Sequence, residues 1–191
     1  MKRIHILIVV TLILGLFSCK PISMLIAKTT GEYIEPVKEN DKSISTYCQD
    51  KRVKFDKLYI LKSEDNFVSF LGKYKSVPGI YIFDKNKFLI TTAFKNDCPW
   101  TMINLLYDTS LKTKSIQDTT EYSEILSHFN LVDNKTFNKD ADYYILCTWA
   151  KFVPKLTDAL FATINKQKEE NKINVCHILL NVDLQEGWDS K

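Results

Sequence analysis

The sequence predicts an α/β protein in which helices flank one mixed sheet. Runs rich in β-branched and aromatic residues, which are typical of strands, alternate with segments whose apolar residues recur at helical spacing. The chain has 191 residues, 45% of them hydrophobic, which is long enough to bury a core. Only 5 residues are Gly, where an average usage of about 7% would give roughly 13. No G-x-x-x-x-G-K or G-x-G-x-x-G motif occurs, so folds built on glycine-rich phosphate loops are disfavoured.

The N-terminus has the parts of an export signal. Two basic residues precede an apolar run over residues 4–17, and Ser18 and Cys19 follow it. This run is shorter than the about 20 residues that cross a bilayer, which favours a signal peptide over a transmembrane anchor or a buried helix. Residues 16–19 (LFSC) resemble a bacterial lipobox, although Phe17 is bulkier than the usual residue there. The resemblance implies cleavage before Cys19 and attachment of fatty acyl chains to it.

Such an anchor would hold the protein on a membrane outside the cytoplasm. Each buried CH₂ contributes about 0.8 kcal/mol, so two or three acyl chains bind almost permanently. Neither an Asp nor an acidic run follows the cysteine, which leaves the outer membrane, facing the periplasm, as the expected location. We expect residues 1–18 to be the signal peptide, residues 19–50 a lipidated tether, and residues 51–191 a single domain.

The charge balance argues against a nucleic-acid partner. The sequence has 26 basic and 23 acidic residues, and without Lys2 and Arg3 the basic residues number 24. All of these are Lys except Arg52, and Lys lacks the planar fork that recognises bases and phosphates. No dense basic stripe with interleaved aromatics occurs, so we expect no nucleic-acid binding.

The first half of the domain predicts a strand, a helix and a hairpin. Residues 55–61 have the composition of a strand. A helix over residues 63–76 follows from a serine N-cap and from apolar residues at i, i+3, i+4 and i+7. Residues 80–83 and 88–91 are β-rich runs around a four-residue polar turn, which predicts a hairpin.

The middle of the chain carries weaker patterns. A proline near its first turn supports a short helix over residues 97–106. Residues 108–120 are polar and are predicted to be a loop, and a second short helix is expected over residues 121–129.

The last third gives the clearest signal. Residues 143–150 (YYILCTWA) and 173–182 (INVCHILLNV) are apolar runs typical of buried strands. Pro154 opens a predicted helix between them, over residues 154–170. A strand, a helix and a strand of these lengths form a parallel βαβ unit.

The junction between the first of these strands and the helix resembles the active-site segment of thioredoxins. That segment has Trp-Ala after a strand and then Cys-x-Pro-Cys at the start of a helix. Trp149 and Pro154 match it, whereas Phe152 and Lys155 stand at the two cysteine positions. The next strand ends in Val-Asp at residues 182–183, as the corresponding thioredoxin strand does. The resemblance implies a thioredoxin-like sheet without the redox pair.

The order of the elements differs from that of a thioredoxin. The family's cis-proline loop and hairpin follow the βαβ unit, whereas here Pro78 and the predicted hairpin precede it. We therefore expect a thioredoxin-like sheet with rearranged element order, the alternative being a generic α/β sandwich in which helices pack on one sheet. The resemblance implies that the Pro78 loop faces Phe152.

Four cysteines remain once the lipobox cysteine is set aside. Cys147 and Cys176 lie in the two buried strands, where buried thiols are favoured over a bridge. Cys48 and Cys98 have two alternatives, free thiols or a disulfide staple. Cys98 is also the one candidate for a reactive thiol, because the positive end of a helix stabilises a thiolate.

Histidine and tryptophan give weak signals of a site. His128 and His177 lack metal-ligand spacing, so we expect no metal and no cofactor, with His128 on the surface and His177 packed in a strand. Trp188 follows the last strand, where its ring either anchors a glycan or protein partner or packs over the end of the sheet. Packing is the favoured alternative.

Three functional hypotheses follow. The first is a non-catalytic lipoprotein that is held on the membrane by its lipid anchor and binds or assembles a protein partner of the cell envelope. The second is a thiol oxidoreductase or peroxidase that uses Cys98. The third is a carbohydrate-binding accessory lipoprotein that uses exposed aromatic side chains. The missing cysteine pair favours the first hypothesis, and with it a protein that is not an enzyme.

Overall fold

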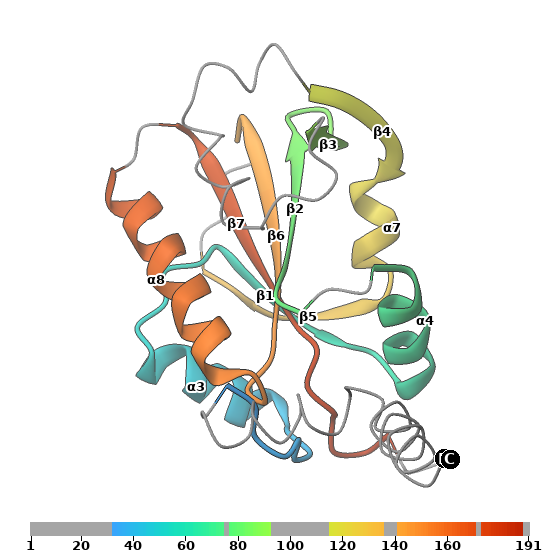
Figure 1. The fold of residues 1–191 in the computed structure, drawn as a ribbon, viewed down its shortest axis with the longest axis vertical. Coiled ribbons are helices and arrows are strands. Elements are labelled where there is room, and N and C mark those ends of the chain that lie inside the picture. The colour runs from blue at the N-terminus through green and yellow to red at the C-terminus, as the bar shows by residue number, and fades with distance from the viewer. Residues whose placement is uncertain (1–31, 75–76, 93–114, 136–140, 171–172, 189–191) are drawn as a thin grey trace, which may run out of the picture.

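Two neighbouring strands, β6 (Tyr143–Trp149) and β7 (Val175–Asn181), lie at the centre of the fold (Figure 1). The computed structural model describes residues 32–74, 77–92, 115–135, 141–170 and 173–188. Within them, seven strands form one mixed sheet in the order β4-β3-β2-β6-β7-β1-β5. Helices lie on both faces of this sheet, which confirms the α/β class with a mixed sheet and flanking helices.

The centre of the sheet is the βαβ unit that the sequence predicts. β6 and β7 pair in parallel from Tyr143↔Val175 to Trp149↔Asn181. The helix α8 (Pro154–Glu170) connects them, beginning at the proline, whose fixed φ and missing N–H suit the first helical position. Six of the seven residues of each strand are buried, which agrees with their continuous apolar composition.

Two strands extend the sheet on the β7 side. β1 (Lys57–Leu61) pairs with β7 in parallel, and the strand predicted over residues 55–61 is confirmed. β5 (Phe129–Asn134) pairs with β1 antiparallel at the edge. The composition of β5 does not predict a strand, because an edge strand needs few apolar residues and β5 has only one buried position, Phe129.

The predicted hairpin extends the sheet on the β6 side. β2 (Gly79–Asp84) and β3 (Phe88–Thr92) pair antiparallel, and β2 also pairs antiparallel with β6, from Gly79↔Thr148 to Asp84↔Tyr143. β4 (Ser115–Glu121) then pairs with β3 at the other edge. The expectation of a loop over residues 108–120 is therefore wrong for residues 115–120, where backbone pairing with β3 forms a strand despite the polar composition.

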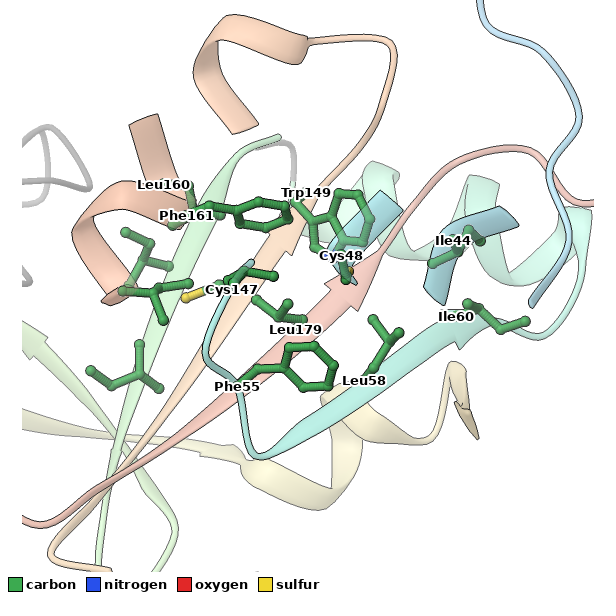
Figure 2. Packing of buried hydrophobic residues seen from close by; sticks show 14 of the residues in the cluster. Ile44, Cys48, Phe55, Leu58, Ile60, Cys147, Trp149, Leu160, Phe161 and Leu179 are labelled. Atoms are coloured by element: carbon green, nitrogen blue, oxygen red, sulfur yellow. The ribbon is translucent and has the colours of Figure 1, made fainter. Parts of the chain in front are cut away.

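Alternate residues of the central strands supply two separate cores. Ile145, Cys147 and Trp149 of β6 face α8 and the helix α3 (Asp41–Asp50), as Figure 2 shows for Cys147 and Trp149. Tyr144 and Leu146 face the opposite way, toward α4 (Glu64–Tyr74) and α7 (Tyr122–Leu126). Side chains alternate across a strand, so the sheet is covered by a helical layer on each face.

The second half of the expected tether belongs to the domain. Residues 41–50 form α3, in which Ile44 and Cys48 are buried in the core (Figure 2). A capping box begins this helix, since Ser43 N–H donates to the Asn40 side chain and Asn40 N–H to the Ser43 hydroxyl. Residues 41–50 therefore pack into the core and do not form a tether, because the mostly polar composition of α3 includes two residues, Ile44 and Cys48, at core positions.

Several expectations lie outside the described residues. These are the signal peptide of residues 1–18, the lipidated Cys19, and the short helix over residues 97–106. Of the helices that the structure describes, none has both the length and the apolar composition required to cross a bilayer.

Candidate functional site

The junction between β6 and α8, whose sequence resembles the thioredoxin motif, lies at the end of the sheet where β6 stops and β2 starts. Gly79 pairs with Thr148, and the Gly79 N–H donates to the Thr148 hydroxyl oxygen at 2.6 Å. The next residues outward along these antiparallel strands are Pro78, whose peptide bond with Val77 is cis, and Trp149. The Pro78 loop therefore lies beside the end of β6, next to the junction that leads into α8.

The two cysteine positions of the motif hold residues in different environments. Phe152 is partly buried, its carbonyl accepts from Ile34 N–H at 2.9 Å, and its ring meets the Tyr33 ring edge-on at 6.1 Å. Lys155 is exposed in the first turn of α8. The segment that precedes α3 thus packs on the first motif position, a contact with no signal in the sequence.

A buried carboxylate holds the loop between β6 and α8. Both Asp183 side-chain oxygens accept from Lys151 N–H, at 3.0 and 2.9 Å, and one also accepts from the Asn181 amide at 2.7 Å. Burial raises the pKa of the Asp183 carboxyl, and these donors oppose that effect. The Val-Asp pair at the end of β7 therefore has a structural task, which is to fix the backbone of the motif loop.

A second buried carboxylate ties the N-terminal segment to the same loop. Glu39 is 4% exposed and accepts from Lys151 Nζ at 2.6 Å and from the Ser43 hydroxyl at 2.6 Å. Its backbone N–H donates to Leu184 O, and Glu186 N–H donates back to Glu39 O. The interactions of Glu39 cannot be predicted from the sequence, because Glu39 lies in a charged run whose composition is typical of solvent-exposed chain.

At the end of β6, Trp149 packs against two other aromatic rings. Trp149 is fully buried, stacks on the Tyr47 ring at 5.7 Å and meets Phe161 edge-on at 5.1 Å. Burial raises the pKa of Tyr47 to about 12. An open depression of about 440 Å³ lies over α3, and its lining includes Tyr47, Asn40 and Lys151.

The described thiols are not placed for chemistry. Cys147 and Cys176 are free and buried on opposite faces of the sheet, so the expectation of buried thiols is confirmed. Cys48 is also free and buried, with its pKa raised to about 12 by desolvation. Cys48 thus points into the core rather than out of a tether, unlike the position that the predicted Cys48–Cys98 staple assumes. Cys98 itself lies outside the described residues.

The histidines and Trp188 are accounted for by packing. His177 is 1% exposed, its Nε2 lies 2.9 Å from Gln167 Oε1, and its backbone N–H donates to the Asp56 carboxylate. His128 is half-buried against the Phe70 ring. The Trp188 ring is partly buried 6.1 Å from Phe67 of α4, which favours packing over an exposed binding role. The described part of the chain contains no group of three His, Cys, Asp or Glu side chains that could hold a metal.

No protein-family model, curated protein or solved structure matches this chain. The geometry of the site therefore carries the functional argument alone.

Removing the lysine of the buried ion pair should destabilise the domain. Lys151→Met leaves the Glu39 carboxylate buried without its charge partner, and we expect the free energy of unfolding to fall by about 2–3 kcal/mol. The matched control is Lys54→Met, because Lys54 forms an exposed pair with Glu169 and should change stability by less than about 1 kcal/mol. Urea denaturation measures the free energy of unfolding of both variants. Equal decreases in the two variants would contradict a larger contribution from the buried pair than from the exposed one.

The stability of the domain should fall in acid because of His177. Burial lowers the pKa of His177 to about 3, against about 6.5 in an unfolded chain. Between these values the unfolded state binds a proton that the native state does not, so stability falls by about 1.4 kcal/mol per pH unit as the pH decreases. His177→Leu should reduce this slope between about pH 6 and pH 4, whereas His128→Leu should largely keep it. Denaturation curves at several pH values measure the slopes, and an unchanged slope in His177→Leu would contradict the assignment.

Proposed function

We propose that the protein is an exported, lipid-anchored lipoprotein whose domain is a non-catalytic, thioredoxin-like binding module. The observation that carries this proposal is the placement of the Pro78 loop beside the junction of β6 and α8, with Phe152 and Lys155 at the cysteine positions. This is the arrangement that the resemblance to thioredoxins implies.

The sheet supports the thioredoxin-like part of the proposal. The βαβ unit of β6, α8 and β7 comes last along the described chain, whereas the hairpin of β2 and β3 comes earlier and yet joins the free side of β6. The hairpin and the βαβ unit are thus neighbours in the sheet although the hairpin comes first along the chain, and this supports the rearranged element order that we propose. The function of a binding module depends on the surface that the packed elements form. It does not depend on the order of those elements along the chain.

Two features support a role without thiol chemistry. The nucleophile in such chemistry is a thiolate, and a motif without cysteine at either position supplies none. The three cysteines of the described residues are buried, and desolvation raises the pKa of each thiol. What remains for a binding role is the surface at the junction, where Phe152 is partly buried and Lys155 is exposed.

The lipid anchor rests on residues 16–19, which resemble a lipobox. Fourteen residues, 20–33, separate Cys19 from Ile34, whose backbone N–H donates to Phe152 O. A domain anchored in this way operates at a membrane surface, and its partners are proteins of the cell envelope. The proposed location is the outer membrane, facing the periplasm.

Installing cysteines at the two motif positions should give the protein a disulfide-reductase activity. The double variant Phe152→Cys/Lys155→Cys installs a Cys-x-Pro-Cys sequence at the start of α8, beside the Pro78 loop. We expect this variant, in a Cys98→Ser background, to reduce insulin in a dithiothreitol-coupled turbidity assay, and the unmodified protein to stay at the background rate. The matched control is Ala159→Cys/Ala162→Cys, which places the same spacing on the exposed part of α8 away from the loop.

Two outcomes would contradict the proposed module. A folded double variant no more active than the mid-helix control would argue against a thioredoxin-like site. Activity of the unmodified protein that disappears in Cys98→Ser would favour the thiol enzyme instead.

Replacing the lipobox cysteine should release the protein from the membrane. The Cys19→Ala chain should keep residues 1–18 and carry no acyl chains, whereas the unmodified protein begins at Cys19 with two or three chains. Intact-mass analysis and membrane fractionation measure both properties, and Cys98→Ala serves as the control. An unmodified protein that keeps its initiator methionine and lacks acyl chains would disprove the anchor.

A further inference from the structure

We propose that one end of the domain lies directly on the lipid bilayer, through an apolar patch formed by Ile34, Val37 and Leu156. This inference rests on the proposed lipid anchor and adds to it an orientation. The module then does not swing freely on a tether but rests on the membrane with its thioredoxin-like junction near the bilayer surface.

The three side chains of the apolar patch are large, aliphatic and exposed. Their exposed fractions are 48% for Ile34, 61% for Val37 and 43% for Leu156. A single exposed aliphatic residue is ordinary, but several at one end of a domain indicate a contact surface.

Backbone contacts and sequence position place these three residues near one loop of the molecule. Ile34 N–H donates to Phe152 O, and Leu156 follows in the first turn of α8. Val37 lies between Ile34 and Glu39, whose carboxylate binds Lys151. These residues therefore lie near the loop between β6 and α8. Figure 1 shows this loop at the end of the molecule that carries α3 and the start of α8.

The apolar patch is also the place where the chain arrives from the proposed anchor. Ile34 is held on the domain by the hydrogen bond from its N–H to Phe152 O. Fifteen steps along the chain join Cys19 to Ile34, which limits their separation to about 50 Å even when the chain is fully extended. Because the anchor keeps the domain at the bilayer, contacts too weak to bind from solution suffice to orient it.

The charges beside the apolar patch are mixed. Lys38 and Lys155 are exposed there, and so are Glu32 and Glu35. The lysine stems can extend toward lipid phosphates, but the acidic residues offset much of any attraction to anionic lipid. The contact thus depends on apolar insertion into the headgroup region, typically about 5–10 Å deep, and should change little with salt.

Site-specific fluorescence on the full-length, acylated protein tests the orientation. An environment-sensitive nitrobenzoxadiazole label is attached at Ile34→Cys or Leu156→Cys, or at Asn86→Cys in the turn between β2 and β3 as a control. Asn86 is exposed at the opposite end of β2 from Gly79, and the buried native thiols should resist labelling, with Cys98→Ser as background. The protein is reconstituted in vesicles of phosphatidylethanolamine and phosphatidylglycerol that contain brominated acyl chains.

We expect a blue-shifted emission and severalfold greater bromine quenching at positions 34 and 156 than at position 86, with little change when salt is raised. Adding Val37→Glu should reduce the quenching at position 156 severalfold. Val68→Glu should leave it unchanged, because Val68 is an equally exposed valine, 65% against 61%, on α4.

Equal quenching at the three positions, on protein whose mass shows an acylated Cys19, would overturn the orientation while leaving the lipoprotein proposal intact. Labels at 34 and 156 that are already shielded in detergent without a bilayer would mean that residues 20–31 or a second copy cover the apolar patch, which also overturns it. Absence of acyl chains in the mass spectrum would instead overturn the proposed anchor, and the orientation with it.

Discussion

A strand whose two faces are both apolar is stable only when both are covered, and β6 and β7 are such strands. Their side chains alternate between a core under α3 and α8 and a core under α4 and α7. Parallel pairing of the two strands needs a crossover, and α8 supplies both the crossover and half of one cover. The three-layer architecture follows from this requirement, and so does the position of the loop that leaves β6 at the sheet end.

At that end of the sheet two carboxylates, those of Asp183 and Glu39, are buried and need hydrogen-bond or charge partners. Asp183 accepts from the backbone of the loop, and Glu39 binds the side chain of Lys151 in the same loop. Buried carboxylates are costly unless they are paired and hydrogen-bonded, so each holds its partner in one geometry. The consequence is a rigid junction in which the segment before α3 and the residues after β7 both close on the loop.

In the binding module that we propose, the junction lies where the N-terminal segment meets the domain. The Phe152 carbonyl and ring are both engaged by the segment that arrives from the N-terminus. The proposed anchor and the proposed binding surface therefore share one end of the domain. A module arranged in this way would meet its partner at the membrane surface, where the partner's approach is confined to the plane of the bilayer.

Helices and strands whose own residues are buried can be predicted from the local sequence pattern. The strands around Cys147 and Cys176, the helix from Pro154 and the hairpin follow from apolar composition, helical spacing and turn chemistry. The edge strands β4 and β5 did not follow from it, because a strand with one partner is held by backbone hydrogen bonds and leaves little trace in composition. Of the candidate site, the motif at Trp149 and Pro154 was visible in the sequence, but its setting was not.

By itself, then, the amino-acid order determined the α/β class, the central βαβ unit and the absence of the redox pair, since each depends on residues close together in the chain. Only the tertiary structure decided that Pro78 lies beside the end of β6, that Glu39 and Ile44 belong to the domain, and that Cys48 is sealed inside it. The physical reason is that a buried ion pair or a strand neighbour is a relation between distant segments. Local periodicity carries no record of which segment a given side chain will meet.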